Sequence, residues 1–164
     1  YVQGGITETD QWRLTTSFTS NADPIASNWE RNDGSGFGLL GTGMTESSGI
    51  FTFPSTGYWL IIYKCLAGTQ YDPSAHTQGV WIDIKTTLNN SSYTNISSSQ
   101  QGAYNFSTAY YTGMSLYTDY QFDVTNTTNC KIRFGFGAGQ GGEACRGHTS
   151  YQHTGVSFIR LGDT

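Results

Sequence analysis

Short stretches in which apolar and polar residues alternate recur along the chain, and turn-forming residues separate them. Alternation with a period of two is typical of β-strands that bury one face and expose the other. The pattern predicts about ten strands in two antiparallel sheets, which is an all-β sandwich, and no helix. The clearest strands are expected at residues 12–18, 49–53, 58–66, 80–85, 120–124, 132–136 and 156–161.

The segment 58–66 differs from the others because large apolar side chains point to both of its faces. The two sets are Tyr58, Leu60 and Ile62 on one face, and Trp59, Ile61 and Tyr63 on the other. A strand in an antiparallel sandwich normally buries one face only, so the second face of this strand needs a cover. In a chain of 164 residues, the expected cover is another copy of the same chain.

Polar stretches at residues 67–78, 88–104 and 137–153 are expected to form three long loops. Loops of this length on a compact domain often carry function. The length of the chain suits one domain. We interpret residues 1–10 as a connector from a missing N-terminal region, and residues 11–164 as a single head domain.

Composition supports this fold class and narrows the range of partners. Only 12% of the residues are charged, and Gly, Ser, Thr, Asn and Gln replace the missing charge. The net charge is −4 and no cluster of Lys and Arg exists, which argues against nucleic acid because phosphate binding needs clustered basic residues. No apolar run reaches the ~20 residues that a membrane-spanning helix requires, so no membrane insertion is expected.

The best sequence motif lies just before the strand with two apolar faces. Gly49, Phe51, Pro54, Gly57 and Tyr58 form a pattern that resembles the tumour necrosis factor (TNF)-like jelly rolls, a superfamily that includes the globular heads of the first complement component. Weaker matches at 110–116 and at the last strand, 154–162, extend the resemblance over nearly the whole chain. The resemblance implies a two-sheet antiparallel jelly roll that assembles as a compact homotrimer.

In such a trimer, aromatic residues of the inner sheet pack around the three-fold axis. The candidates for trimer-interface or core positions are Tyr58, Trp59, Tyr63, Tyr111 and Phe158. Each of them has a simpler interpretation as an ordinary core residue of the sandwich, and the sequence does not decide which face each one serves.

The Ser-, Thr-, Asn- and Gly-rich composition and the short ending Phe-Ile-Arg-Leu-Gly-Asp suggest the kind of protein that carries such a head. The chain lacks the collagen-like stalk and the regular cysteines of secreted complement-like heads, and it is more similar to the C-terminal heads of structural proteins from bacteriophages, marine phages in particular. This similarity implies a non-enzymatic domain on the virion surface, at the head of a fibre, an appendage or a capsid decoration. It would join other virion proteins through the missing N-terminal region.

The expected partner of such a head is a host cell-surface glycan or protein. Aromatic and amide-rich loops suit sugar recognition, and the candidate ligand-binding residues are the loop tyrosines Tyr71, Tyr93, Tyr104 and Tyr151. Two alternatives stay open: a purely architectural role in the particle, and a secreted, extracellular complement-like or lectin-like recognition module.

No catalytic, metal or cofactor site is predicted. Serines are frequent, but no Gly-x-Ser-x-Gly elbow occurs, and the acidic residues are scattered, with Asp83 and Asp123 expected at solvent-facing strand positions. Cys145, His148 and His153 have a spacing that zinc ligands can show, but a polar loop with a lone thiol explains them as well.

Three cysteines are present, so at least one is unpaired or bonds to another chain. Cys65 is expected to be a small core residue, and a bridge between Cys130 and Cys145 stays open. Five Asn-x-Ser/Thr sequons begin at Asn89, Asn90, Asn95, Asn105 and Asn126. We interpret them as a result of the composition, because Asn, Ser and Thr are so frequent, rather than as glycosylation sites.

Overall fold

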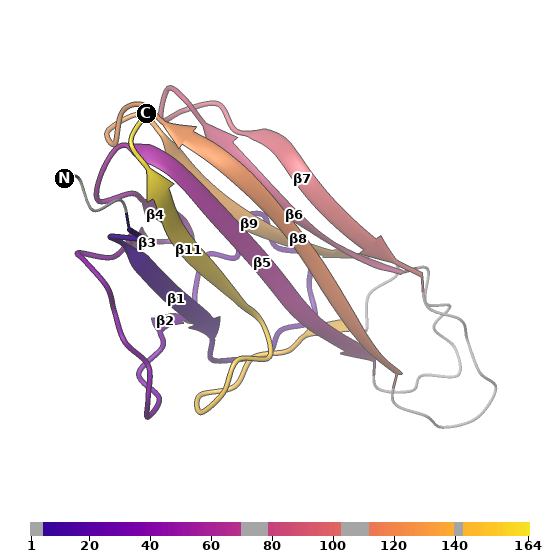
Figure 1. The fold of residues 1–164 in the computed structure, drawn as a ribbon. Helices are drawn as coiled ribbons and strands as arrows, with labels where there is room; N and C mark the ends of the chain where they lie inside the picture. Colours follow the sequence, from indigo (N-terminus) through magenta and orange to yellow (C-terminus); the bar gives the residue numbers. More distant parts are fainter. Residues whose placement is uncertain (1–4, 70–78, 103–111, 140–142) are drawn as a thin grey trace.

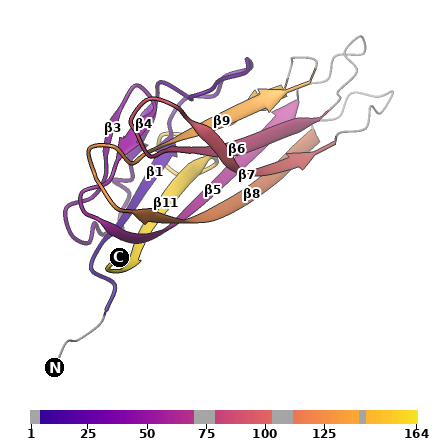
Figure 2. The same cartoon turned by 90° about the horizontal axis from the view of Figure 1, so that it is seen from above.

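The computed structural model describes residues 5–69, 79–102, 112–139 and 143–164. In these ranges eleven strands form two antiparallel sheets that lie against each other as two layers (Figures 1 and 2). The strands are β1 (Thr9–Leu14), β2 (Trp29–Arg31), β3 (Thr45–Ser47), β4 (Ile50–Thr52), β5 (Gly57–Thr69), β6 (Val80–Thr87), β7 (Thr94–Gln101), β8 (Thr112–Val124), β9 (Lys131–Ala138), β10 (Glu143–Cys145) and β11 (Gly155–Gly162). The described residues contain no helix, and therefore none that could span a membrane.

One sheet has six strands. Its main path runs β5–β11–β1–β2, β10 continues the β11 edge of β5 beyond Lys64, and β8 pairs with the opposite edge of β5 along its whole length. The second sheet has five strands in the order β3–β4–β9–β6–β7. The prediction of an all-β, two-sheet antiparallel sandwich is therefore confirmed. β1 begins at Thr9, two residues before the domain boundary expected from the sequence.

The core lies between the two sheets and is rich in aromatic rings. Phe51, Phe134 and Phe158 come from three different strands, and their ring centroids are 5.4 to 6.0 Å apart. The Tyr63 ring packs on Phe134, and its hydroxyl donates a hydrogen bond of 3.2 Å to the carbonyl oxygen of Gly135 in the opposite sheet. The only polar atom of this buried side chain is thus paired, which avoids the cost of burying an unsatisfied hydroxyl.

β5 and β8 form the longest ladder of the molecule, from the pair Gly57–Val124 to the pair Thr69–Thr112. Alternation along β5 directs Trp59 and Tyr63 into the core, where they are 1% and 0% exposed, and directs Tyr58 outward, where it is 38% exposed. The two apolar sets of the segment 58–66 therefore serve two different faces, as the pattern predicts.

Two strands lie where the sequence predicts loops. β7 falls within 88–104 and is almost entirely polar, because it is an edge strand that pairs with β6 alone. Its Ser97 hydroxyl lies 2.5 Å from the hydroxyl of Thr118 in β8, so a polar pair closes this side of the sandwich. β10 is the second, within 137–153.

The first strand ends earlier than its alternation predicts, at Leu14 rather than at Phe18. Beyond Leu14 the backbone leaves the ladder: Thr15 N–H bonds to the carbonyl of Asn28, and Phe18 forms an isolated bridge with Cys145. Alternation of residue types continues through this turn and therefore overstates the length of the strand.

The expectation that Asp83 faces solvent is wrong. Its side chain points away from the core, yet Asp83 is only 6% exposed. The reason is the neighbouring strand β9, where Gly135 has no side chain. A Cβ atom there would lie 2.4 Å from Asp83 Oδ1, so the carboxylate occupies the space that a side chain would fill.

Candidate functional site

The outer face of the six-stranded sheet carries an apolar patch. Leu60 of β5 lies directly opposite Ile159 of β11, and Ile62 lies one pleat further along β5. All three side chains are half-buried in the single chain. Tyr58 and Tyr117 extend the patch and are 38% and 56% exposed. We call these five residues the apolar face. The outward positions of β8 beside it are polar: Asp123, Gln121 and Asp119 lie opposite Tyr58, Leu60 and Ile62.

The residues predicted at a trimer interface or in the core separate into two groups. Trp59, Tyr63 and Phe158 are fully buried between the sheets, whereas Tyr58 lies on the apolar face. Tyr111 lies outside the described residues. The sequence-based set thus mixes both faces of the sheet, and it does not include Leu60, Ile62 and Ile159.

The predicted loop tyrosines do not come together. Tyr93 contacts the five-stranded sheet, where the guanidinium of Arg133 lies 4.4 Å from the centre of its ring. Tyr151 lies between β10 and β11, on the side of the six-stranded sheet, and is 55% exposed. Tyr71 and Tyr104 fall outside the described residues.

Tyr151 borders a cleft of about 280 Å³ beside β1. The cleft lies between the segment that follows β2, which contributes Asn32 and Phe37, and the segment 150–152. Its floor includes Gln11, on the outward side of β1. A second hollow of about 340 Å³ shares Gln11, Gly36 and Phe37 with the first and continues toward Ile159. We call the two together the β1 cleft.

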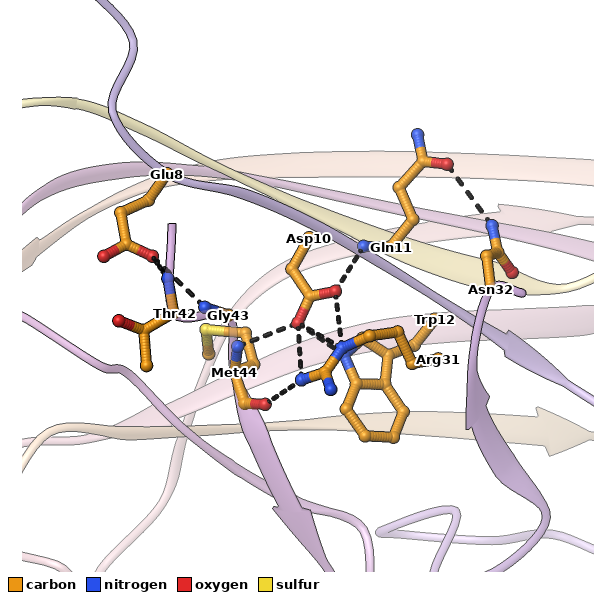
Figure 3. Close-up of polar contacts among 9 residues, drawn as sticks. All are labelled: Glu8, Asp10, Gln11, Trp12, Arg31, Asn32, Thr42, Gly43 and Met44. Carbon is orange, nitrogen blue, oxygen red and sulfur yellow. Dashed lines mark hydrogen bonds and ion pairs between the residues drawn. The ribbon is translucent and has the colours of Figure 1, made fainter. Parts of the chain in front are cut away.

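Two acidic side chains, the buried Asp10 and the half-buried Glu8, anchor both ends of the segment 32–41, part of which lines this cleft. Asp10 is 1% exposed and accepts hydrogen bonds from the Met44 backbone N–H at 2.8 Å, from Trp12 Nε1 at 2.9 Å and from the guanidinium of Arg31 at 3.0 to 3.2 Å (Figure 3). Glu8 accepts from the backbone N–H groups of Thr42 and Gly43. These contacts attach the segment 42–44 and β2 to β1.

Because these acidic groups already accept several hydrogen bonds, the cluster is structural rather than an open site. Arg31 completes it by donating a hydrogen bond of 2.5 Å to the carbonyl oxygen of Met44, while its guanidinium lies 4.8 Å from the centre of the Trp12 ring. Charge-assisted hydrogen bonds of this kind are among the strongest in proteins.

Arg13, on the cleft side of β1, is neutralised by two carboxylates. It is 4% exposed and donates to Glu30 Oε2 at 2.8 Å and to Asp33 Oδ1 at 2.5 Å. The hydrogen bond from Arg13 holds the pKa of Asp33 below its usual range. With two acceptors already bound, Arg13 presents little free positive charge to a ligand.

Three aromatic rings pack together in the segment before β11. The His148 and Tyr151 rings are stacked with centroids 3.7 Å apart, and the His153 ring meets both edge-on. His148 Nδ1 accepts a hydrogen bond from the Ser150 backbone N–H at 3.0 Å. Burial, with the nearby charges of His148 and Arg146, lowers the pKa of His153. The stack holds the Tyr151 ring in one orientation at the border of the β1 cleft.

The cysteine that lies close to Cys145 is Cys65, and not Cys130 as in the bridge that the sequence left open. All three are buried and free, and the Cys145 sulfur lies 3.6 Å from that of Cys65 rather than near Cys130. A hydrogen bond to Cys65, together with burial, raises the pKa of the Cys145 thiol. Within the described residues, no three His, Cys, Asp or Glu side chains are grouped closely enough to hold a metal ion.

Comparison with solved structures identifies the architecture. A structure of Eiger TNF from S. frugiperda superposes with a TM-score of 0.70, at 10% identity, over 98% of this chain and 96% of the other. The chain has a TNF-like jelly-roll fold. Murine APRIL at pH 5.0 superposes with a TM-score of 0.63, at 13% identity, over 94% of this chain and 98% of the other. No protein-family model and no curated protein matches the sequence.

The TNF-like resemblance of the motif Gly49–Tyr58 is thus supported by the three-dimensional fold of the whole chain, whereas the similarity to phage heads has no counterpart among these structures. The sequence-based candidates include Tyr151, which borders this cleft, but not Gln11, Asn32 and Phe37. A glycine-rich segment beside an aromatic residue, Gly34 to Gly38 around Phe37, was the available signal.

Proposed function

We propose that this chain is a non-enzymatic recognition domain that assembles as a homotrimer through the outer face of its six-stranded sheet. The observation that carries the proposal is the apolar face, where Leu60, Ile62 and Ile159 lie side by side with Tyr58 and Tyr117. Apolar side chains gathered in this way on an outer sheet face mark an interaction site, and the polar residues opposite them on β8, Asp119, Gln121 and Asp123, would form its rim.

Burial of this face supplies the driving force for assembly. Fully burying a Leu or Ile side chain contributes about 1.5–3 kcal/mol, so completing the burial of three neighbours and two tyrosine rings adds up to several kcal/mol per subunit. A rotationally symmetric assembly that closes on itself leaves no copy of the face exposed. The TNF-like resemblance of the sequence implies three copies.

For the biological setting, we propose the head of a virion fibre, appendage or capsid decoration, which binds a glycan or protein of the host surface. The support is compositional: low charge and a high content of Ser, Thr, Asn and Gly. The loop tyrosines are the proposed contacts, and of these Tyr151 borders a cleft.

A secreted recognition module is the second candidate, and a specific observation favours it. Asn89, Asn90, Asn95 and Asn126 each head a sequon and are exposed, so a glycan at any of them would meet solvent. Intact-mass measurement of the native protein distinguishes the two settings: heterogeneity that a glycosidase removes supports the secreted module, and a single unmodified mass supports the virion head.

Native mass by light scattering tests the assembly. We expect about 54 kDa for three chains of 17.9 kDa. Ile62→Asp should yield a folded monomer of 17.9 kDa, because an unpaired charge buried in the interface costs about 3–5 kcal/mol, which is more than 100-fold in affinity. Gln100→Asp, at an exposed outward position of β7, is the matched control and should stay trimeric.

A wild-type chain of 17.9 kDa at all concentrations would refute the trimer, and so would an unaltered trimer of Ile62→Asp. The melting temperature offers an independent check. Assembly stabilises the folded state by mass action, so the melting temperature of the wild type should rise with protein concentration, and that of Ile62→Asp should not.

A further inference from the structure

We propose that the β1 cleft is a binding site for a neutral saccharide. This inference rests on the proposed recognition function and names its ligand class and its location. The site is formed by Gln11, Asn32, Phe37, Tyr151 and Gln152.

The polar groups of the cleft match hydroxyl groups. Three amide side chains, Gln11, Asn32 and Gln152, line it, and each amide offers both a donor and an acceptor. Asn32 Nδ2 donates to Gln11 Oε1 at 3.3 Å, and Gln152 Nε2 donates to the carbonyl oxygen of Trp12 at 2.9 Å. These bonds leave other donors and acceptors of the three amides free for a ligand. A sugar hydroxyl, which donates and accepts at once, can use both kinds of group.

Asn32 supplies an acceptor that the fold does not use. Its Oδ1 is shielded from solvent and has no hydrogen-bond partner among the described residues. An unsatisfied buried acceptor costs about 1–3 kcal/mol. A ligand hydroxyl that donates to Asn32 would supply the missing partner and remove that cost.

Aromatic rings supply the apolar part of the site. Phe37 lines the first hollow, where its ring can stack on one sugar ring, whereas the second hollow reaches Ile159 at the proposed trimer interface. Tyr151 stands at the rim, held by its stack on His148. The first hollow, at about 280 Å³, lies just below the range of ~300–1,000 Å³ for ligand pockets and suits a single ring.

Charge excludes the acidic sugars. Arg13, the one basic residue that lines the cleft among the described residues, already binds Glu30 and Asp33, and the latter is 70% exposed at the rim. A sulfate or carboxylate would meet no free cation and would be repelled by Asp33. The site therefore selects uncharged hexose or N-acetylhexosamine units.

The test uses an array of immobilised neutral and anionic oligosaccharides, followed by titration calorimetry with the best neutral probe. We expect the wild-type chain to retain neutral probes only. Tyr151→Ala and Phe37→Ala should each weaken binding about tenfold, the equivalent of one hydrogen bond or ring contact. Gln100→Ala, at an exposed outward position of β7 in the other sheet, is the control and should stay within about twofold of the wild type.

Retention of no neutral probe, retention of anionic probes, or an equal loss in Gln100→Ala would each overturn the saccharide site. The native mass of every variant is measured in parallel. A trimer that binds no saccharide refutes this inference and leaves the assembly standing, whereas a monomer that binds a neutral probe refutes the assembly and leaves the cleft standing.

Discussion

The two sheets of this sandwich treat their outer faces in opposite ways. On the five-stranded sheet, Asp23 forms ion pairs with Lys85 and Arg133, and the latter also covers the ring of Tyr93. On the six-stranded sheet, the central outward positions of β5 and β11 hold Leu60, Ile62 and Ile159. The first face is adapted to water, whereas the second has an apolar centre bordered by the polar side chains of β8, Asp119, Gln121 and Asp123.

This difference teaches that the role of a residue follows from the layer it occupies and not from its type. Trp59 and Tyr58 are neighbours in β5, and both are aromatic. Trp59 lies in the core between the sheets, whereas Tyr58 lies on the apolar face. Stability of the single chain should depend on the first, and self-association on the second.

The largest expected effect is that of Trp59→Ala. The indole is 1% exposed and packs on Phe53 at a centroid distance of 5.3 Å, so its loss should lower the free energy of unfolding by about 3–5 kcal/mol. Chemical denaturation of the monomeric Ile62→Asp background measures this without a contribution from assembly. In the same background Tyr58→Ala should cost less than about 1 kcal/mol. Equal losses would abolish the distinction between the two layers.

A smaller effect is expected on the water-adapted face. Asp23→Asn removes the acceptor shared by Lys85 and Arg133, but both ion pairs are partly exposed and therefore screened. We expect a loss of about 1 kcal/mol or less in thermal unfolding, smaller still at high salt, and no change in native mass. A change in native mass would show that the five-stranded sheet also takes part in assembly.

The smallest effect concerns Asp83, which is buried over Gly135. Burial raises the pKa of Asp83 above its usual 3.8, against the attraction of Lys85. A carboxyl group with a raised folded-state pKa destabilises the fold at neutral pH, and this penalty fades as the pH falls through that pKa toward 3.8.

Asp83→Asn should therefore raise the melting temperature slightly at pH 7, by the equivalent of less than about 1 kcal/mol, and leave it unchanged near pH 3. Thermal unfolding at both values of pH measures the difference, with Asp163→Asn, a carboxylate that is 91% exposed after β11, as the control. A lower melting temperature at pH 7 would mean that the ion pair with Lys85 outweighs the cost of burial.

The fold class could be predicted from the sequence because alternation records burial directly. Strands such as β9 carry core residues at every second position. In β5, large apolar side chains at both odd and even positions indicate that both of its faces are covered. β7 could not be recognised in this way, since an edge strand of Ser, Thr, Asn and Gln has no apolar side to alternate. The burial of Asp83 depends on glycines in a neighbouring strand some fifty positions away, which no local pattern contains.

The candidate site could be predicted only in part for a similar reason. Tyr151 stands out as an aromatic residue in a polar loop, and it does border the β1 cleft. Gln11 and Asn32 look like ordinary polar residues, and only the pairing of β1 with β2 brings them together. The sulfur contact of Cys65 with Cys145 likewise depends on the pairing of β5 with β10 and not on spacing along the chain.

The direction of β1 and β11 has one more consequence. Thr9 pairs with Ile159 near the end of β11, whereas residues 150–152 precede its start, so the C-terminus and this wall of the cleft lie toward opposite ends of the sandwich (Figure 1). Rotation about a single three-fold axis preserves direction along that axis, so the three clefts of a trimer would face the same end of the assembly. Avidity gains of about 10²–10⁴ are typical when linked sites engage together, so even a millimolar single-site affinity would give firm adhesion to a surface that displays many copies of its sugar.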